Sequence, residues 1–144
     1  MIRLADIDES NWRTPLSVSE HQRPFVSDSA ALLARAYAYR NSRSRAFLIC
    51  DGDTAVGMAL YYDCDPLAAY DLSQLFIDER FQRRGYGTAA ATLIFNAMRA
   101  EGKYRKVVLC YIEGNHTARK FYERFGFVET DRDGDEIIME LTLS

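Results

Sequence analysis

A short stretch with two glycines, at residues 82–87, constrains the fold more than any other feature of this chain. It follows an apolar run at residues 75–77 and leads into residues 89–100, where apolar side chains recur at helical spacing. Glycines let the main chain approach phosphate oxygens closely, and the unpaired amides at the start of a helix attract anions. Three arginines within residues 80–84 add positive charge. The stretch therefore predicts a strand, an anion-binding turn and a helix, in that order.

The overall composition indicates one ordinary globular domain. With 144 residues, of which 48% are hydrophobic and 27% charged, the chain is long enough for a substantial core. No apolar run approaches the ~20 residues of a membrane span and no signal-peptide pattern is seen, so we expect a cytoplasmic protein that contacts no membrane. The three cysteines are scattered and the two histidines lie far apart, so we expect neither a metal site nor a disulfide framework.

Charge is distributed unevenly along the chain. Residues 51–79 contain seven acids and no Lys or Arg, whereas the next five residues contain three arginines. This change of sign suggests an anionic ligand beside the arginines and a cationic ligand nearer the acids, although acids in turns are equally often solvated surface residues. The net charge of -3 does not suggest a nucleic-acid-binding protein, which usually has a basic face.

Hydrophobic periodicity predicts a mixed α/β domain built around one sheet. Apolar or alternating runs predict strands at residues 2–5, 46–50, 55–62, 71–77, 106–112, 127–130 and 137–143. Helical spacing and capping residues predict helices at residues 30–39, at 89–100 and after Asn115, and we expect one or two short helices within residues 11–28. The strand at residues 106–112 is almost entirely apolar, which predicts that both of its faces are covered.

A second motif follows that strand and narrows the choice of fold. Residues 115–127 have the sequence Asn-His-Thr-Ala-Arg-Lys-Phe-Tyr-Glu-Arg-Phe-Gly-Phe, and residues 82–87, Gln-Arg-Arg-Gly-Tyr-Gly, match the pattern Q/R-x-x-G-x-G/A. At this separation the two motifs resemble the GNAT superfamily of acetyl-CoA-dependent N-acetyltransferases, and the element order agrees over essentially the whole chain. The resemblance implies a single domain over residues 1–144. Its mostly antiparallel sheet would have six to seven strands, splayed between the fourth and fifth, with about four helices.

Shorter features resemble bacterial spermine/spermidine acetyltransferases in particular. They are Asn11-Trp12, Gln22 followed by Phe25-Val26, residues 76–82, and the Tyr86-Gly87 ending of the glycine loop. In that subgroup the loop often has the sequence Gln-Gly-Lys-Gly-x-Gly, and here Arg83 and Arg84 replace the Gly-Lys pair. Arg84 preserves the charge, whereas the loss of glycine at position 83 stiffens the loop. Cys110 also stands where a serine or a similar residue is expected.

The resemblance implies a site for acetyl-CoA that is made largely of main chain. The pyrophosphate would be held by the amides of Arg84, Gly85, Tyr86, Gly87 and Thr88, assisted by the side chains of Gln82, Arg83 and Arg84. The acetyl-pantetheine arm would lie between the splayed strands, where the main chain of Phe76 and Ile77 would pair with it like an added strand. Asn115 matches the cofactor-contacting asparagine of the family, and it could equally be a simple helix N-cap or serve both purposes.

Tyr122 is the candidate proton donor, because in the family the matching tyrosine protonates the departing thiolate of CoA. It follows Asn115 by seven residues, so both lie on one face of a helix, ~10 Å apart along its axis. A phenol, with a reference pKa of about 10, still carries its proton at neutral pH. The alternative is a tyrosine that only packs in the core with Phe121 and Phe125.

The base that deprotonates the acceptor amine is less clearly marked. At pH 7 an amine of pKa about 10.4 is neutral in fewer than about one molecule in a thousand, so some group must accept its proton. Asp71 is the first candidate, followed by Asp63, Asp78 or backbone carbonyls acting through water. Carboxylates and aromatic faces attract polyamines, so an amine site could be lined by Tyr61, Tyr62, Asp63, Asp65 and Asp71, with Trp12 and Phe25 as its wall.

Taken together, these residues predict an N-acetyltransferase that uses acetyl-CoA and acts on a small primary amine by direct attack in a ternary complex. Polyamines such as spermidine or spermine are the first expectation for the acceptor. A protein N-terminus, a protein lysine, an aminoglycoside or an amino acid remain alternatives, and so does a sensor that binds acetyl-CoA without turnover. Members of the family are often dimers, so a homodimer is among the expected assemblies, although no segment marks an interface.

Overall fold

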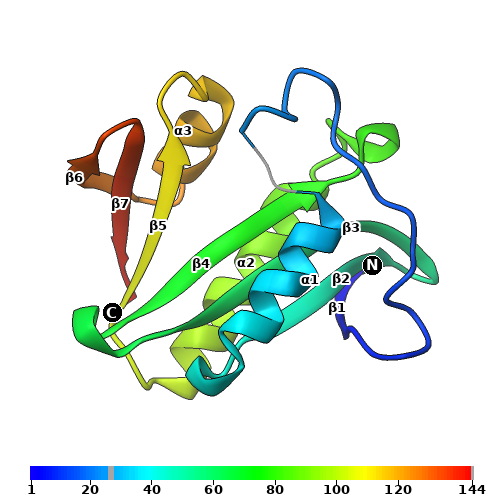
Figure 1. Cartoon of the computed structure of the whole chain (residues 1–144), viewed down its shortest axis with the longest axis horizontal. Coiled ribbons are helices and arrows are strands. Elements are labelled where there is room, and N and C mark those ends of the chain that lie inside the picture. The colour runs from blue at the N-terminus through cyan, green and yellow to red at the C-terminus, as the bar shows by residue number, and fades with distance from the viewer. Residues whose placement is uncertain (26–27, 144) are drawn as a thin grey trace.

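One seven-stranded sheet runs through the molecule (Figure 1). The computed structural model describes residues 1–25 and 28–143. The strands are β1 (Ile2–Asp6), β2 (Arg45–Asp51), β3 (Thr54–Cys64), β4 (Ala69–Ile77), β5 (Lys106–Ile112), β6 (Val128–Asp133) and β7 (Glu136–Thr142). Their order across the sheet is β1-β2-β3-β4-β5-β7-β6, and every neighbouring pair is antiparallel except β4 and β5. This is the mostly antiparallel mixed sheet that the sequence predicts.

Helices cover both faces of the sheet. They are α1 (Ser29–Ala38), α2 (Tyr86–Glu101) and α3 (His116–Glu123), joined by the short 3-10 turns η1 (Arg40–Ser42), η2 (Asp65–Leu67) and η3 (Glu79–Phe81). Side chains of a strand alternate between faces, and in β3 Met58 and Leu60 pack with Leu32 of α1, whereas Ala59 packs in the cluster around Ile94 of α2. The helix α1 therefore lies on one face and α2 on the other, as Figure 1 shows.

The predicted helices between residues 11 and 28 are absent from the described part of this segment. Residues 11–25 form turns and extended chain, so three α-helices are seen instead of about four. Leu16 and Val18 are both buried against the α1 side of the sheet, and their spacing of two is that of extended chain. Pro15 and Pro24 also disfavour helix in the residues that precede them. Residues 26 and 27 lie outside the described residues.

The strands β4 and β5 pair at only one end. Tyr70 and Asp71 pair with Val107 and Val108, and no further pair joins the two strands in the described residues. Figure 1 shows β4 and β5 diverging beyond this point. The predicted splay is therefore confirmed, and its closed end lies at Asp71.

A bulge in β4 marks the place where the two strands separate. Leu60 of β3 pairs with Gln74, and its neighbour Tyr61 pairs with Leu72, so Ser73 is an extra residue without a partner in the ladder. A bulge bends its strand and increases the local twist. The bulge therefore directs the second half of β4 away from β5.

Within the described residues, no helix has the length and apolar character needed to cross a bilayer.

Candidate functional site

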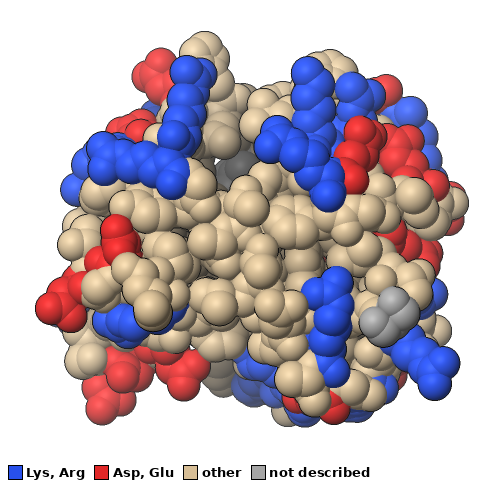
Figure 2. Space-filling view, turned by 180° about the vertical axis from the view of Figure 1, so that it is seen from behind, with Lys and Arg blue, Asp and Glu red and all other residues tan. Residues whose placement is uncertain are grey.

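A groove opens where β4 and β5 separate. The described residues that line it are Phe25, Leu72, Ser73, Gln74, Leu75, Leu109, Cys110, Tyr111, Asn115, Ala118 and Tyr122. The predicted site residues Asn115 and Tyr122 thus lie in one groove with the bulge of β4. Seen from behind, Lys and Arg side chains stand on both sides of a hollow at the upper edge of the molecule, where Figure 1 places α3 and η3 (Figure 2).

The register of β4 decides which main-chain groups face this groove. The Asp78 amide donates to the Val56 carbonyl at 2.7 Å, so Asp78 and, two residues earlier, Phe76 direct their main-chain groups toward β3. In agreement, a Cβ atom on Gly57 of β3 would collide with the Phe76 carbonyl oxygen. Leu75 and Ile77 therefore direct their main-chain groups away from β3 and toward the groove.

This register corrects the prediction for Phe76. Its main chain is used by β3, and its side chain is buried on the α1 side of the sheet. Sequence periodicity shows which side chains share a face, but the direction of the main-chain groups depends on pairing with β3. The main-chain groups of Leu75 and Ile77 point toward the groove, and the pairing of Ile77 with pantetheine stays a prediction.

The loop before α2 forms the predicted turn between a strand and a helix, and anion binding by this turn stays a prediction. Two of its residues have left-handed main chain, Arg83 with φ 64° and Gly85 with φ 79°. Among the described residues no side chain caps the start of α2, whereas side chains cap both α1 and α3. The first amides of α2, at Tyr86, Gly87 and Thr88, therefore remain open to an anion. Arg84 lies on the exposed surface of the same loop.

At Gly87 the start of α2 lies near its neighbours, at distances where a Cβ atom would make ordinary van der Waals contact. A Cβ atom there would be 3.5 Å from the Phe121 ring of α3 and 3.7 Å from the Ile77 side chain of β4. The Tyr86 hydroxyl donates to Asp51 at 2.7 Å, so this tyrosine holds the turn against β2. Main chain rather than side chains is thus what this end of α2 presents to a ligand.

Gln82 is placed differently from its predicted role. Its side-chain amide donates to the Ile77 carbonyl at 3.1 Å and to the Gln22 side chain at 2.5 Å. The side chain therefore ties the loop to the end of β4 and to the N-terminal segment, and does not extend from the loop like the exposed Arg83 and Arg84.

Tyr122 lies in the wall of the groove among aromatic rings. Its ring centroid is 5.0 Å from that of Phe121 and 5.5 Å from that of Phe127. Burial raises the pKa of Tyr122 above its ordinary value, so the phenol keeps its proton at neutral pH. Asn115 caps α3, because its side-chain oxygen accepts from the Ala118 amide at 3.2 Å. The helix-capping role of Asn115 is thus confirmed, and its contact with the cofactor stays a prediction.

Asp71 is the carboxyl group best suited to accept a proton. It lies at the closed end of the splay, and its half-buried side chain shares a face with Cys110. Burial raises the pKa of Asp71 to about 6, with the charge of Arg35 opposing this shift. A carboxylate of this pKa is ionised at neutral pH and binds a proton more readily than an ordinary aspartate.

The other two candidate bases are held as ions by hydrogen bonds. Asp63 accepts from Arg43 at 2.6 Å, from Lys103 at 2.8 Å and from Arg45 at 3.0 Å. Burial opposes the ionisation of Asp63, but these bonds lower its pKa to about 2. Asp78 is also buried, and bonds from Arg80 and from the Ser17 amide keep its pKa below the ordinary value. Neither carboxylate is suited to accept a proton at neutral pH.

The amine site that was predicted from the acidic stretch at residues 51–79 is not formed as predicted. Tyr61 packs in the α2-side core, Asp63 is paired with cations, and Asp65 accepts a hydrogen bond from Tyr104. Tyr62 and Asp71 are the members of the predicted set that lie together, since the charge of Asp71 affects the pKa of Tyr62. Trp12 is also not at this groove, whereas Phe25 lines it.

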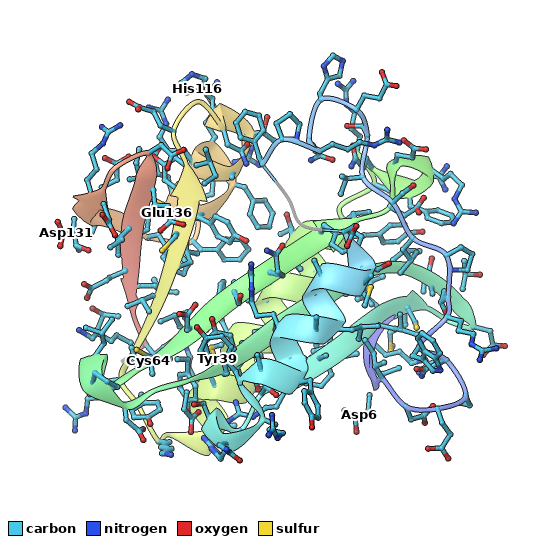
Figure 3. All side chains as sticks on the ribbon, viewed as in Figure 1. Asp6, Tyr39, Cys64, His116, Asp131 and Glu136 are labelled. Carbon is cyan, nitrogen blue, oxygen red and sulfur yellow. The ribbon has the colours of Figure 1, made fainter. Side chains whose placement is uncertain are left out.

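The hairpin of β6 and β7 supplies acids that lie outside the predicted amine site. Cys110 is exposed in the middle of β5, so the predicted cover on both faces of β5 is wrong. Burial, followed by the charges of Asp71, Glu136 and Asp133, raises the pKa of the Cys110 thiol. Figure 3 shows Glu136 on the same side of the sheet as α1. The four acids within residues 131–136 were the sequence feature from which this acidic hairpin could have been predicted.

The sequence of the chain also matches a known protein family. The model of the acetyltransferase (GNAT) family matches residues 4–127. The chain belongs to this family. The predicted fold class and the predicted activity, acetyl-CoA-dependent N-acetyl transfer, are thereby confirmed at the level of the GNAT family.

Individual relatives agree with this assignment. The chain is 28% identical over 134 residues to the spermine/spermidine N(1)-acetyltransferase of Bacillus subtilis, with 87% of each chain covered. The crystal structure of the ribosomal-protein-S18-alanine N-acetyltransferase from Escherichia coli has a TM-score of 0.77 at 19% identity, covering 100% of this chain and 95% of that one. The spermidine N-acetyltransferase from Vibrio cholerae, in complex with CoA and spermine, has a TM-score of 0.77 at 15% identity, with 99% and 95% covered.

The variants Arg83→Gly and Arg83→Ala separate the charge of Arg83 from its main-chain conformation. Glycine adopts φ 64° without strain, so Arg83→Gly is expected to be about 1 kcal/mol more stable than Arg83→Ala in urea unfolding. Both variants lose the guanidinium, and both are expected to bind CoA about tenfold more weakly in calorimetric titration. Equal stabilities, or unchanged CoA affinity in both variants, would contradict these roles.

Proposed function

We propose that this protein transfers the acetyl group of acetyl-CoA to a primary amine of a polyamine, by direct attack in a ternary complex. The observation that carries this proposal is the groove between β4 and β5. Tyr122 lines this groove, and Asp71, whose carboxyl has a raised pKa, is the last residue of β4 that pairs with β5, next to the lining residue Leu72. A candidate proton donor and a candidate proton acceptor are therefore available to a substrate bound where the two strands separate.

The residues present fit acetyl-CoA, which when bound supplies an activated acetyl thioester. The uncapped amides of Tyr86, Gly87 and Thr88 would hold the pyrophosphate, with Arg83 and Arg84 beside them. We propose that Asn115, in the groove wall, also contacts the cofactor.

The groove-facing main chain of Leu75 and Ile77 would pair with the pantetheine amides as an added strand does. Leu75 lines the groove together with Tyr122, so its amide is our candidate donor to the thioester oxygen. Gln82 already donates to the Ile77 carbonyl, so the amide of Ile77 is the group left for pairing.

Proton transfer is assigned to two side chains. Asp71 would accept the proton of the acceptor amine, directly or through water, since its carboxylate is ionised above pH 6. Tyr122 would give its proton to the thiolate sulfur, and burial among Phe121 and Phe127 keeps that proton in place until then. The second proton that the nitrogen loses on becoming an amide would return through water to the Tyr122 phenolate. No covalent bond to the protein is needed in this scheme.

A cationic acceptor fits the negative charges around Cys110, which lines the groove. The charges of Asp71 in β4 and of Glu136 and Asp133 in the β6–β7 hairpin all raise the pKa of the Cys110 thiol. These three carboxylates therefore lie around Cys110. Tyr62 is buried with its ring stacked on the exposed Tyr39 at a centroid distance of 4.0 Å, so Tyr39 presents the aromatic surface of this pair. The Bacillus and Vibrio relatives are named as spermine or spermidine acetyltransferases, which supports the same substrate class.

A protein N-terminus is the second candidate acceptor. The exposure of Cys110 leaves the sheet uncovered on the acceptor side, which gives room for an extended peptide. The similar fold of the S18-alanine acetyltransferase is compatible with that alternative.

The acceptor class is tested by measuring release of CoA thiol with acetyl-CoA against spermidine, spermine, diamines, an amino acid, an aminoglycoside and an N-terminal peptide. We expect saturable turnover with spermidine or spermine at micromolar KM. We also expect Glu136→Gln to raise that KM with little change in kcat, because it removes attraction remote from the reacting amine. Turnover on the peptide alone would overturn the polyamine proposal and leave the family assignment intact.

The proton acceptor is tested by the pH dependence of kcat/KM. Asp71 is protonated below its folded pKa of about 6, so activity is expected to rise with pH through that value. Asp71→Asn should remove this rise and lower kcat on the order of a hundredfold. Because the raised pKa makes ionised Asp71 unfavourable to the folded state at neutral pH, the variant should not be less stable than the wild type there.

The matched variant Tyr122→Phe keeps the ring packing and removes the proton. It should lower kcat by a similar factor while retaining the rise near pH 6. A full kcat for Tyr122→Phe between pH 6 and 9, or an unchanged pH profile for Asp71→Asn, would contradict the corresponding role.

A further inference from the structure

A second cavity, of about 560 Å³, lies on another part of the molecule. Its walls are the N-terminal segment at residues 12–17, the first turns of α1, and Asp78 with Arg80 after β4. None of its lining residues is among those that line the groove of the proposed acetyl transfer. Its volume is within the range of about 300–1,000 Å³ that is typical of small-molecule sites.

An aromatic ring stands in the wall of this cavity. Trp12 is the chain's single tryptophan, and 49% of it is exposed. The Arg13 guanidinium lies 4.9 Å from the centre of its ring. Leu16 and Leu33 add apolar surface to the same cavity. A flat apolar group could therefore stack on Trp12 and lose contact with water.

The charged groups of the cavity favour an anion. Arg13 and Arg80 supply two guanidiniums, and Asp78 supplies the one carboxylate in the lining. The oxygens of Asp78 already accept from the Ser17 amide and from Arg80. Arg13 forms no ion pair with any acid in the described parts of the chain, residues 1–25 and 28–143. Its charge is therefore available to a ligand, with a fork that matches a carboxylate.

We propose that this cavity binds a small aromatic anion, with its ring on Trp12 and its carboxylate or sulfonate between Arg13 and Arg80. The site is distinct from the acetyl-transfer groove and from both substrates proposed there.

Hydrogen bonds connect the cavity wall to the cofactor loop. The Glu79 amide donates to the Ser17 carbonyl at 2.9 Å, and the Ser17 amide donates to Asp78 at 2.9 Å. A few residues on, Gln82 joins Gln22 to the Ile77 carbonyl. A ligand that holds Arg80 against the N-terminal segment would restrain this connection and the loop at residues 82–87. The bound anion is therefore expected to tighten CoA binding, and CoA to tighten anion binding by the same factor.

The test uses 2-naphthoate as the probe and 2-naphthylmethylammonium as a cation of matched shape. The chain's single tryptophan gives one indole N–H signal in a nitrogen–proton correlation spectrum, so that signal reports on this cavity. We expect naphthoate to shift it saturably and the cation to leave it unchanged. Arg13→Ala and Arg80→Ala should each weaken naphthoate binding about tenfold. Arg40→Ala is the matched control, because Arg40 stacks on Tyr37 outside the cavity and should have no effect.

Three results would overturn the proposal: no saturable shift with naphthoate, equal or tighter binding of the cation, or equal affinities in Arg13→Ala and Arg40→Ala. Arg13 is exposed, so its variant is expected to fold, and the remaining signals of the spectrum verify this. A calorimetric Kd for CoA that is the same with and without naphthoate would overturn the connection to the loop. None of these readouts depends on catalytic turnover, so they stand apart from the proposed acetyl transfer.

Discussion

The separation of β4 from β5 beyond Asp71 is the constraint on which the rest of the structure depends. A strand in the middle of a sheet normally pairs on both sides, and main-chain groups without partners are costly when buried. The bulge at Ser73 ends that pairing on one side, while β3 continues to hold β4 on the other. The main-chain groups of Leu75 and the amide of Ile77 are therefore left for a ligand or water to satisfy, whereas the Ile77 carbonyl already accepts from Gln82. An extended chain of amides such as pantetheine is suited to this position.

The elements around the groove are arranged to keep it open and to close one end of it. The start of α2 at Gly87 lies against Phe121 of α3, so the turn before α2 and the tyrosine of α3 are held near each other. Arg43, Arg45 and Lys103 gather around Asp63 near the closed end, which joins β2, β3 and the segment after α2. The site is thus held by packing and ion pairs that do not themselves contact the proposed substrates.

Much of this arrangement could be predicted from sequence because it depends on local patterns. Glycines at 85 and 87, the cap at Asn115 and the helical spacing that brings Tyr122 to the same face are properties of neighbouring residues. The strands were also predictable from their alternation. The exposure of Cys110 could not be predicted in this way. The apolar composition of its strand predicts burial, whereas the position of α1 decides which part of the sheet is covered.

The sequence-based predictions that were wrong share one cause, because each of them depends on contacts between residues far apart in the chain. Phe76 and Ile77 are adjacent in an apolar run, and only the register with β3 shows that their main chains point in opposite directions. Asp63 and Asp71 look alike in sequence, yet one is surrounded by cations and the other is half-buried with few. Gln82 likewise turns inward because the Ile77 carbonyl and Gln22 lie within its reach.

The most direct test of this account is amide hydrogen exchange of β4, measured by NMR with and without saturating CoA. The account predicts that exchange at Leu75 and Ile77 slows strongly when CoA is bound, because their amides face the groove and gain partners there. Exchange at Phe76, whose amide pairs with β3, should change little. If CoA binds and the amides of Leu75 and Ile77 exchange as before, the splayed edge of β4 is not the pantetheine site and the account is wrong.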